Sequence, residues 1–427
     1  SANQDIIKCG GYTGTGTSTI NTINLGFEPQ WVLFKRVDSG DNWYLLDSMR
    51  GFVDLDTGDK TIIPNESNAE QDINTNFFGS RGPRLTATGF EFKNTATVNG
   101  STGKYVYMAI RRGPLTTPTS ASDVFTIDTL GSTGDGSEPG FRSSFVVDWA
   151  LQKNIIGSNE NWELLARQIQ GCSLRPNNTN AIDTGQSAEQ FDYQNGFNNN
   201  TTTNGNVYAW MWKRAPSFCD VVNYIGNGST PRTVNHNLGV VPEMIWVKNR
   251  DAAENWTVYH EALGTGSYLK INDAQPKITG SGRFDTAPTS SNFTLGTAQE
   301  VNGNGDKYQA ILFSTLAGVS KVGSYTGNGS TSGLTIDCGF SNGAKLIIIK
   351  GYGGGSNDAD WYVFDSVRGI TFGNDPWLEL NTDDGETSVS VAVKPDNSGF
   401  QVVGATTSGH ATVNKVGETY IFYAVAI

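Results

Sequence analysis

The feature that most constrains this fold is a pattern of residues that occurs four times along the chain. A Trp recurs about every hundred residues and a Lys precedes it each time, in the pairs Lys35/Trp43, Lys153/Trp162, Lys248/Trp256 and Lys350/Trp361. Three copies also close with an Asn and a Tyr at one fixed interval, namely Asn99/Tyr105, Asn302/Tyr308 and Asn414/Tyr420. A repeat of this length is too long for a propeller blade, which takes roughly 40–50 residues, and long enough to fold as a domain.

Short runs of β-branched and aromatic residues fill each copy. In the first copy they read "QWVLFKRV", "NWYLLDS", "GFEFKN" and "KYVYMAI", and Gly, Asn and Asp lie between them. Such runs are typical of strands. In the last run both alternating faces are apolar or aromatic, which favours a strand buried between two layers. The sequence therefore predicts an all-β protein of four tandem antiparallel β-sandwich-like repeats, each of about a hundred residues.

The closing strands set the boundaries of the repeats. We place them at 1–112, 122–215 (the most divergent), 220–316 and 321–427. The stretch "RGPLTTPTSAS" at 112–122 reads as a Pro/Thr/Ser linker, and we expect limited proteolysis to cut there first.

The Trp persists in all four copies while its neighbours vary, so we expect each ring to be buried within its own repeat. An Asp and an Arg follow the first and the last Trp, as Asp47/Arg50 and Asp365/Arg368. The Asp position holds Ala166 in the second repeat and His260 in the third. An Asp and an Arg at this spacing could bind a ligand, but they can also pair or cap the backbone where a strand ends. The variation favours the structural interpretation.

A Tyr-x-Gly-x-Gly phrase opens three of the copies: "GYTGTGTST" at 11–19, "NYIGNGSTPR" at 223–232 and "GSYTGNGSTSG" at 323–333. We interpret it as a strand followed by a turn, because Gly and Asn tolerate the positive φ that tight turns need. A phosphate-binding loop is the competing interpretation, and it is disfavoured because the chain has no GxGxxG or Walker sequence.

Composition disfavours several classes of function. The net charge is −12 with no Lys/Arg cluster, which argues against nucleic acid as a partner. No apolar run is long enough for membrane insertion. The four cysteines lie far apart, so free thiols are expected rather than a disulfide framework or a zinc site.

Motifs for catalysis or metal binding are also missing. The chain has no HExxH, GxSxG or paired-Cys signature, so we expect no catalytic residues, no metal, no cofactor and no enzyme activity. Acidic turns such as "NTDDGE" at 381–386 do not fit an EF-hand loop and are interpreted as solvated turns. Glycoside hydrolysis stays open, because 42 acidic residues supply many carboxylate pairs.

Taken together, the motifs resemble a repeat domain of virion proteins of tailed bacteriophages, especially marine ones. The fourth copy carries "YTGNGS", "DWYVFDSVRG" and "VNKVGETY", and the third carries "YIGNGS" and "VNGNGDKY". The resemblance covers the whole chain, except that the second copy has lost the Asp-Ser-x-Arg-Gly segment. It implies a place on the exterior of the virion, as a tail fibre or appendage protein that contacts the host surface. A capsid-decorating or spacer protein without a ligand, and a tail-associated glycan depolymerase, stay open as alternatives.

Recognition is expected in loops that differ between copies, because the shared residues are those the fold needs. The most distinctive loops are 56–84, "GYGGGSNDAD" at 351–360 and "FGNDPW" at 372–377. Arg and aromatic residues most often anchor recognition, which makes the candidate contact residues Arg81, Arg84, Tyr352 and Trp377. The partners expected are other virion proteins, a host surface glycan and further copies of the chain. These loops could equally pack against neighbouring virion subunits.

Overall fold

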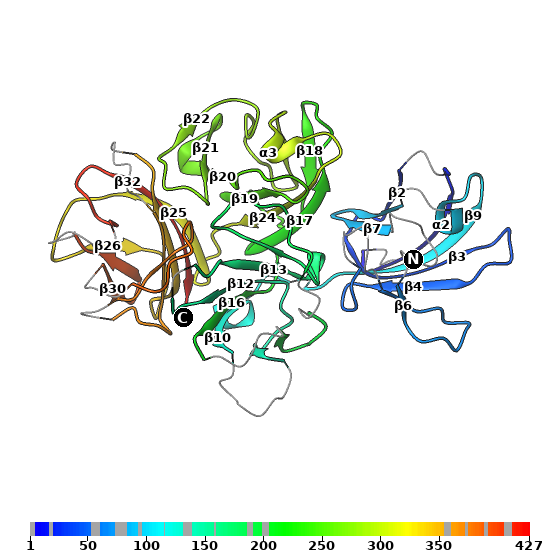
Figure 1. Cartoon of the computed structure of the whole chain (residues 1–427), viewed down its shortest axis with the longest axis horizontal. Coiled ribbons are helices and arrows are strands. Elements are labelled where there is room, and N and C mark those ends of the chain that lie inside the picture. Colours follow the sequence, from blue (N-terminus) through cyan, green and yellow to red (C-terminus); the bar gives the residue numbers. More distant parts are fainter. Residues whose placement is uncertain are drawn as a thin grey trace.

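The computed structural model describes residues 5–16, 20–52, 60–72, 83–92, 96–114, 116–130, 139–157, 159–185, 191–198, 205–353, 360–371, 375–387, 392–404 and 412–427. Almost all regular structure is antiparallel β, arranged as sandwich-like pairs of sheets without a closed barrel, which confirms the predicted fold class. Figure 1 shows the first of four units, blue to cyan, beside a larger body that contains the other three.

Each unit is built on one large sheet in which the closing strand lies between the opening strand and the Lys strand. In unit 1 the order is β1 (Ile7–Thr13), β9 (Lys104–Arg111), β3 (Pro29–Arg36), β4 (Trp43–Asp47). In unit 2 it is β10 (Phe125–Thr129), β16 (Val207–Trp212), β12 (Trp149–Asn154), β13 (Glu163–Ala166), β14 (Ser173–Leu174). In unit 3 it is β17 (Cys219–Ile225), β24 (Lys307–Phe313), β19 (Met244–Asn249), β20 (Thr257–His260), β21 (Ser267–Lys270), β22 (Ile278–Thr279). In unit 4 it is β25 (Ser320–Thr326), β32 (Thr419–Ala426), β27 (Ala344–Gly351), β28 (Trp361–Asp365), β29 (Leu378–Glu379).

A smaller sheet covers one face of each large sheet. Its strands are β2 (Asn21–Asn24), β8 (Gly89–Phe92) and β7 (Pro83–Thr86) in unit 1, β11 (Phe141–Arg142) and β15 (Gly196–Phe197) in unit 2, β18 (Arg232–Asn235) and β23 (Asn292–Leu295) in unit 3, and β26 (Leu334–Asp337), β31 (Gly399–Val402) and β30 (Val393–Asp396) in unit 4. A two-stranded ribbon, β5 (Lys60–Thr61) with β6 (Gln71–Asp72), extends unit 1. The described helices are single turns: α2 (Ala96–Asn99), α3 (Gln299–Asn302), and the 3-10 turns η1 (Ala121–Asp123), η2 (Arg167–Ile169) and η3 (Glu261–Leu263).

The Tyr-x-Gly-x-Gly phrase joins the opening strand of a unit to its closing segment. In unit 3, Tyr224 stacks on Tyr308 with ring centroids 5.0 Å apart, and its hydroxyl donates to the carbonyl of Val301 at 2.7 Å. The Asn302 side chain accepts from the N–H of Asn227 at 2.8 Å. Units 1 and 4 repeat these contacts through the pairs Tyr12/Tyr105 and Tyr325/Tyr420 and through Asn99 and Asn414. The phrase is therefore a structural clamp.

Two glycines of this clamp are required for different reasons. A Cβ at Gly226 would lie 2.1 Å from the carbonyl oxygen of Gly303, and Gly14 and Gly327 are equally crowded against the closing segment. Gly228 has φ +64°, and Gly16 and Gly329 have similar positive values, which favour glycine. The predicted strand followed by a turn is confirmed. The turn is not a hairpin, however, because the opening strand pairs with the closing strand rather than with the next one.

The inner face of each large sheet packs against the smaller sheet to form the core of its own unit. In units 2, 3 and 4 the opposite, outer face is buried as well. The outer faces of these three units meet in one hydrophobic cluster that contains Trp149, Trp210, Trp212, Trp246, Phe313 and Tyr423, each at most 1% exposed. Trp149 stacks on Trp212 within unit 2, and Phe313 of unit 3 contacts Tyr423 of unit 4. Units 2–4 therefore surround a shared centre, visible in Figure 1 as the large body.

The recurring Trp residues lie on this outer face, so the expectation that each is buried in its own unit is wrong. Trp162, Trp256 and Trp361 are at most 1% exposed, but they are buried between units. Trp43 of unit 1 is partly exposed. The alternation of side chains along a strand explains this placement, because the Trp residues share a face with the apolar positions that point away from the sandwich core.

None of the four cysteines forms a disulfide, as predicted, and only Cys9 is exposed. No helix in the described part of the chain is long and apolar enough to cross a membrane.

Candidate functional site

The junctions between units 2, 3 and 4 use the same contact three times. The indole N–H of Trp162 in unit 2 donates to the carbonyl of Glu379 in unit 4 at 2.9 Å. Trp256 in unit 3 donates to the carbonyl of Arg175 in unit 2 at 2.9 Å. Trp361 in unit 4 donates to the carbonyl of Lys270 in unit 3 at 2.8 Å. Each unit thus donates to one neighbour and accepts from the other. We call each junction a seam and the closed set of units 2–4 the three-unit ring.

A second hydrogen bond runs the opposite way across each seam. The acceptor is always the carbonyl two residues after the recurring Lys. The donor N–H lies in the segment that follows β14, β21 or β29, which we call the arm of its unit. The pairs are Ile182 to Arg250 at 2.9 Å, Lys277 to Tyr352 at 3.0 Å and Glu386 to Ile155 at 2.8 Å. Because the donating and accepting residues differ, the seam is a heterologous contact that closes after three copies.

The recurring lysines also act at the seams. Lys248 Nζ donates to the carbonyl of Thr179 in unit 2 at 2.8 Å, and Lys350 Nζ donates to the carbonyl of Ala274 in unit 3 at 2.7 Å. Lys153 Nζ lies 5.8 Å from the centroid of the Trp162 ring. Burial lowers the pKa of each of these three lysines to about 8, although nearby carboxylates oppose the shift. The recurring Lys and Trp therefore form contacts that join neighbouring units.

The Asp and Arg that follow the Trp serve local structure, as predicted. Asp365 Oδ1 accepts from the N–H groups of Val367 and Arg368 at 3.0 and 2.9 Å, and its Oδ2 pairs with Arg368 Nε at 2.6 Å. Asp47 makes the same contacts with the backbone and side chain of Arg50. In unit 3, His260 Nδ1 takes over the capping role and accepts from the N–H of Ala262 at 3.1 Å. Burial lowers the pKa of His260 to about 3, so this imidazole is neutral.

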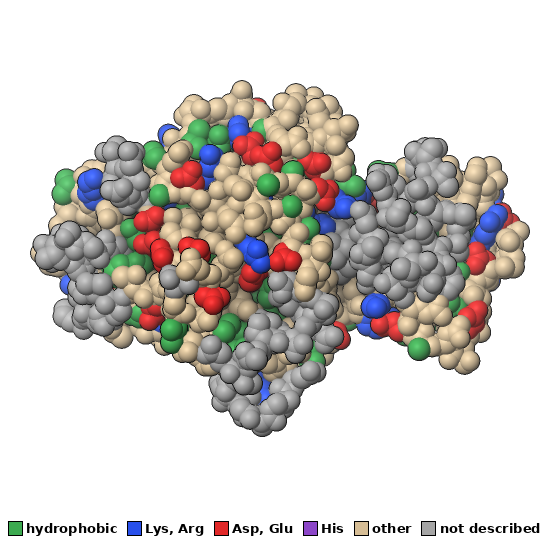
Figure 2. Space-filling view, in the orientation of Figure 1, with side chains coloured by type: hydrophobic (Ala, Val, Ile, Leu, Met, Phe, Trp, Pro, Cys, Tyr) green, Lys and Arg blue, Asp and Glu red, His purple; other side chains and the backbone are tan. Residues whose placement is uncertain are grey.

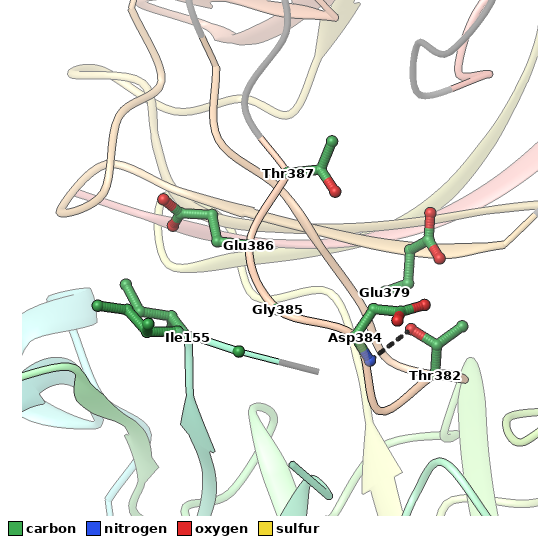
Figure 3. Close-up of a pocket in the computed structure, with 9 residues that line it drawn as sticks. Ile155, Glu379, Thr382, Asp384, Gly385, Glu386 and Thr387 are labelled. Atoms are coloured by element: carbon green, nitrogen blue, oxygen red, sulfur yellow. Dashed lines mark hydrogen bonds between the residues drawn. The ribbon is translucent and has the colours of Figure 1, made fainter. Parts of the chain in front are cut away.

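A cleft of about 710 Å³ opens at the seam between units 2 and 4 (Figure 3). Ile155 and Ile156 line it from unit 2, and unit 4 contributes Glu379, Asp384 and Glu386. The figure shows the carboxyl groups of Glu379 and Asp384 on one side of the arm and that of Glu386 on the other. The cleft therefore combines apolar surface with several hydrogen-bond acceptors.

The acidic groups of this cleft differ in their surroundings. Burial raises the pKa of Glu379 to about 7, and the charge of Asp360 adds to the shift. Glu386 is held by Arg368, with 3.2 Å between the guanidinium nitrogen and the carboxylate. The N–H of Asp384 donates to Thr382 Oγ1 at 3.4 Å. Near neutral pH, Glu379 can therefore donate or accept a proton, while Glu386 is committed to an ion pair.

Unit 1 joins the ring through buried charges. Arg214 forms two hydrogen bonds with Glu28 of unit 1, at 2.9 and 3.1 Å, and lies 3.6 Å from Asp148 and 3.7 Å from Asp220. Burial lowers the pKa of Arg214, but these three carboxylates outweigh it and hold the pKa above its ordinary value. The remaining cations of the cluster are Arg112 and Arg167. Three cations and three anions thus balance at this junction.

A second cleft, of about 690 Å³, lies beside this charge cluster between units 1 and 2. Trp31, Asp47 and Arg50 line it from unit 1, together with Asp148 and Arg167 from unit 2. Asp47 and Asp148 border the same cleft, and both carboxylates are held by hydrogen bonds. Asp47 binds Arg50, and Asp148 accepts from the N–H of Arg214 at 2.7 Å.

Among the predicted contact residues that the structure describes, none is paired with another of the set. Arg81 lies outside the described residues. Arg84 is paired with Glu91 on the neighbouring strand. Tyr352 is partly buried, and its carbonyl accepts the seam hydrogen bond from Lys277. Trp377 is 3% exposed, which leaves its ring almost no surface for a partner.

The sequence analysis missed the acidic seam cleft. Asp384 and Glu386 belong to "NTDDGE", which we interpreted as a solvated turn, whereas Glu386 takes part in the seam through its N–H. The signal was an Asn that follows each recurring Trp by 15 to 20 residues: Asn177, Asn272 and Asn381 each accept from the backbone N–H of that Trp. Across the described residues, no group of three or more His, Cys, Asp or Glu side chains is arranged to hold a metal.

Comparison with known proteins gives the family of the chain but not its activity. No curated protein matches this sequence. The model of a single family, described as a domain of unknown function (DUF7483), matches residues 4–114 and 122–427. The unmatched stretch between the two segments lies within the predicted linker. Since the match covers nearly the whole chain, the protein belongs to the DUF7483 family.

Proposed function

We propose that the protein is a structural component of the exterior of a tailed-bacteriophage virion that contacts the host surface and does not cleave it. One observation carries this proposal: the residues that the units share are used for folding and for joining units. The Tyr and Asn residues clamp the opening loop, the Asp caps a strand end, and the Lys and Trp form the seams. The resemblance of these motifs to phage virion repeats supports the placement.

The seams suit a protein that must keep its shape under mechanical load. Each one combines hydrogen bonds with apolar packing around the shared centre, so units 2–4 form one rigid body rather than a flexible string. Rigid units that present several weak contact surfaces gain affinity through avidity. We therefore infer an appendage whose recognition surfaces lie in the variable segments at the edge of the ring.

The seam cleft between units 2 and 4 is our candidate contact surface. Carboxylates such as those of Asp384 and Glu379 accept hydrogen bonds from vicinal hydroxyl groups, and Ile156, 59% exposed, offers apolar surface to a sugar ring. The net charge of −12 opposes anionic polymers. Figure 2 shows more acidic than basic side chains on the visible face of the ring. A neutral glycan is the ligand that this chemistry favours.

A glycan depolymerase is the second candidate, and the pKa of Glu379 favours it. A carboxyl group with a pKa near 7 beside a second carboxylate, here Asp384, is the arrangement that general acid catalysis of glycoside hydrolysis requires. Against it, Glu386 is occupied by Arg368, and Figure 3 shows its carboxyl group on the other side of the arm. The non-catalytic function remains our conclusion.

Incubation of the purified chain with neutral and acidic envelope polysaccharides tests the proposal. Retention of a neutral polymer at unchanged chain length, weakened in an Asp384→Asn variant, supports an adhesin. Shortened glycan chains, with the shortening lost in a Glu379→Gln variant, would instead establish a depolymerase. The absence of retention would contradict host contact through glycans and support a spacer or decoration protein. Val241→Asp, at a 49% exposed apolar position of unit 3 outside the cleft, serves as the control variant.

A further inference from the structure

Unit 1 contains the accepting half of a seam but does not use it within the chain. In the ring, the groups that form the seams lie at fixed distances from the Asn that binds the backbone N–H of the recurring Trp. The carbonyl that accepts from the indole N–H of the neighbouring unit lies two residues before this Asn, at Arg175, Lys270 and Glu379. The N–H that donates to the neighbouring unit lies five residues after it, at Ile182, Lys277 and Glu386. In unit 1, Asn65 accepts from the N–H of Trp43 at 2.8 Å. The same spacing assigns the acceptor carbonyl to Ile63 and the donor N–H to Glu70.

The donating half of a seam is also present in unit 1. Trp43 and Lys35 stand opposite each other on β4 and β3, in the register of Trp361 and Lys350 on β28 and β27. The carbonyl two residues after Lys35 belongs to Val37, the counterpart of Tyr352. Unit 1 therefore has both complementary halves of the heterologous contact that units 2–4 use three times.

The donating half and the arm are uncovered in unit 1, whereas the side chain of Ile63 packs in the core of the unit. Trp43 and Lys35 are partly exposed, whereas their ring counterparts are at most 1% exposed. Val37 is 55% exposed, and every residue of the arm 64–70 is exposed. Within the described residues, the Trp43 indole N–H and the Glu70 N–H make no hydrogen bond like those at the seams. The arm is thus held within unit 1 by Asn65, and its residues stay exposed to solvent.

The centre of the outer face of unit 1 is apolar, as it is in units 2–4. Met108 on β9 occupies the register position of Trp210, Ile311 and Tyr423, all at most 1% exposed, yet Met108 is partly exposed. Its neighbours Val106 and Ile7 are 38% and 48% exposed. This is the strand whose two apolar faces predict burial between layers, and only one of its faces is covered. The hydrophobic surface of unit 1 therefore matches a ring that lacks two of its members.

We propose that three copies of this chain associate through unit 1 into a closed ring that repeats the seams of units 2–4. The partner is a second copy because the unit supplies both halves of the contact. The number is three because the same contact, formed by three consecutive units of this chain, closes after three steps; a heterologous contact that closes forms a ring and not a filament. The proposal does not depend on what the protein binds.

The test is the mass of the full chain in solution, measured by light scattering after gel filtration over a range of concentrations. We expect a species of three times 46.0 kDa that dissociates to the monomer on dilution. A Leu33→Asp variant places three carboxylates at the centre of the assembly and should therefore reduce the mass threefold. Leu33 is partly exposed in the single chain, so the monomer should tolerate the change. Val241→Asp, at a 49% exposed position of unit 3, should leave the trimer intact.

Labelling of Cys9 by a maleimide gives a second readout that is independent of mass. Cys9 is exposed in the single chain, and its register counterparts Ile127, Val221 and Val322 are buried in the ring. We expect slow labelling in the trimer and fast labelling in Leu33→Asp. A monomer at all concentrations, a dimer or open polymer, or a trimer that survives Leu33→Asp with Cys9 still reactive would each overturn the proposal.

Discussion

Unit 1 and unit 4 share the order of four strands in the large sheet, the Asp–Arg cap and the Lys–Trp pair. Their outer faces differ, because only that of unit 4 is buried. In unit 4 the outer face of the sheet is buried against its neighbours, and Trp361 and Lys350 form hydrogen bonds with unit 3. In unit 1 the corresponding Trp43 and Lys35 are partly exposed. The comparison shows that the Lys–Trp pair is not needed to hold a unit together. Its role is to form contacts with a neighbouring unit.

The largest expected effect concerns the seam tryptophans. Trp256→Ala should lower the free energy of unfolding by about 3–5 kcal/mol, because it leaves a cavity in the shared core and removes the hydrogen bond to the carbonyl of Arg175. Trp43→Ala should cost about 1 kcal/mol or less at concentrations where the chain is monomeric, because the ring is partly exposed. Denaturant unfolding followed by circular dichroism measures both. Equal losses of unfolding free energy in the two variants would show that the outer face of unit 1 is as well covered as that of unit 3.

The junction of unit 1 with the ring should be nearly as sensitive. Arg214→Leu removes the 1% exposed cation that faces Glu28, Asp148 and Asp220, and it should cost about 3–5 kcal/mol. Cleavage within 112–122 by a protease should become faster. Arg36→Leu, which breaks a solvent-screened pair with Asp38, serves as the control and should change stability far less. A junction that tolerates Arg214→Leu would mean that unit 1 is held by other contacts.

The Asp caps offer a matched pair of substitutions. Asp365→Ala should cost about 3 kcal/mol, because it leaves the guanidinium of Arg368 buried and removes the acceptor of Trp210 Nε1 at 3.1 Å. Asp47→Ala should cost only about 1 kcal/mol, the usual loss for a cap that is open to solvent on one side. Thermal unfolding of the two variants ranks them. The reverse order would contradict the burial of the unit 4 cap between units.

The seam lysines predict a smaller pH dependence. The folded-state pKa of Lys153, Lys248 and Lys350 is about 8, below the ordinary value of 10.5, so between these values the unfolded chain binds more protons. Stability should therefore rise with pH from about 8 to about 10, on the order of 1–2 kcal/mol for each lysine. Denaturant midpoints at pH 7.5 and 9.5 measure the rise, and Lys350→Met should reduce it. A fall in stability over this pH range would contradict the lowered pKa of these lysines.

Much of the fold could be predicted from the sequence because it depends on local patterns. The strand runs, the Asp caps and the glycine clamp are set by alternation and by turn chemistry within one repeat. The three-unit ring could not be predicted, because Trp43 and Trp361 each follow a Lys and have the same spacing to Asp, and nothing local distinguishes a covered face from an open one. The acidic cleft was missed for a similar reason. Glu379 and Ile155 are far apart in the sequence and meet only because the ring closes.

The most direct test is hydrogen exchange of the arms of the four units. In the monomeric Leu33→Asp chain, the N–H groups of Ile182, Lys277 and Glu386 should exchange slowly, because each donates across a seam, whereas that of Glu70 should exchange rapidly. In the trimer formed by the unsubstituted chain, Glu70 should become as protected as the other three. Equal exchange of all four groups in the monomer would contradict the account.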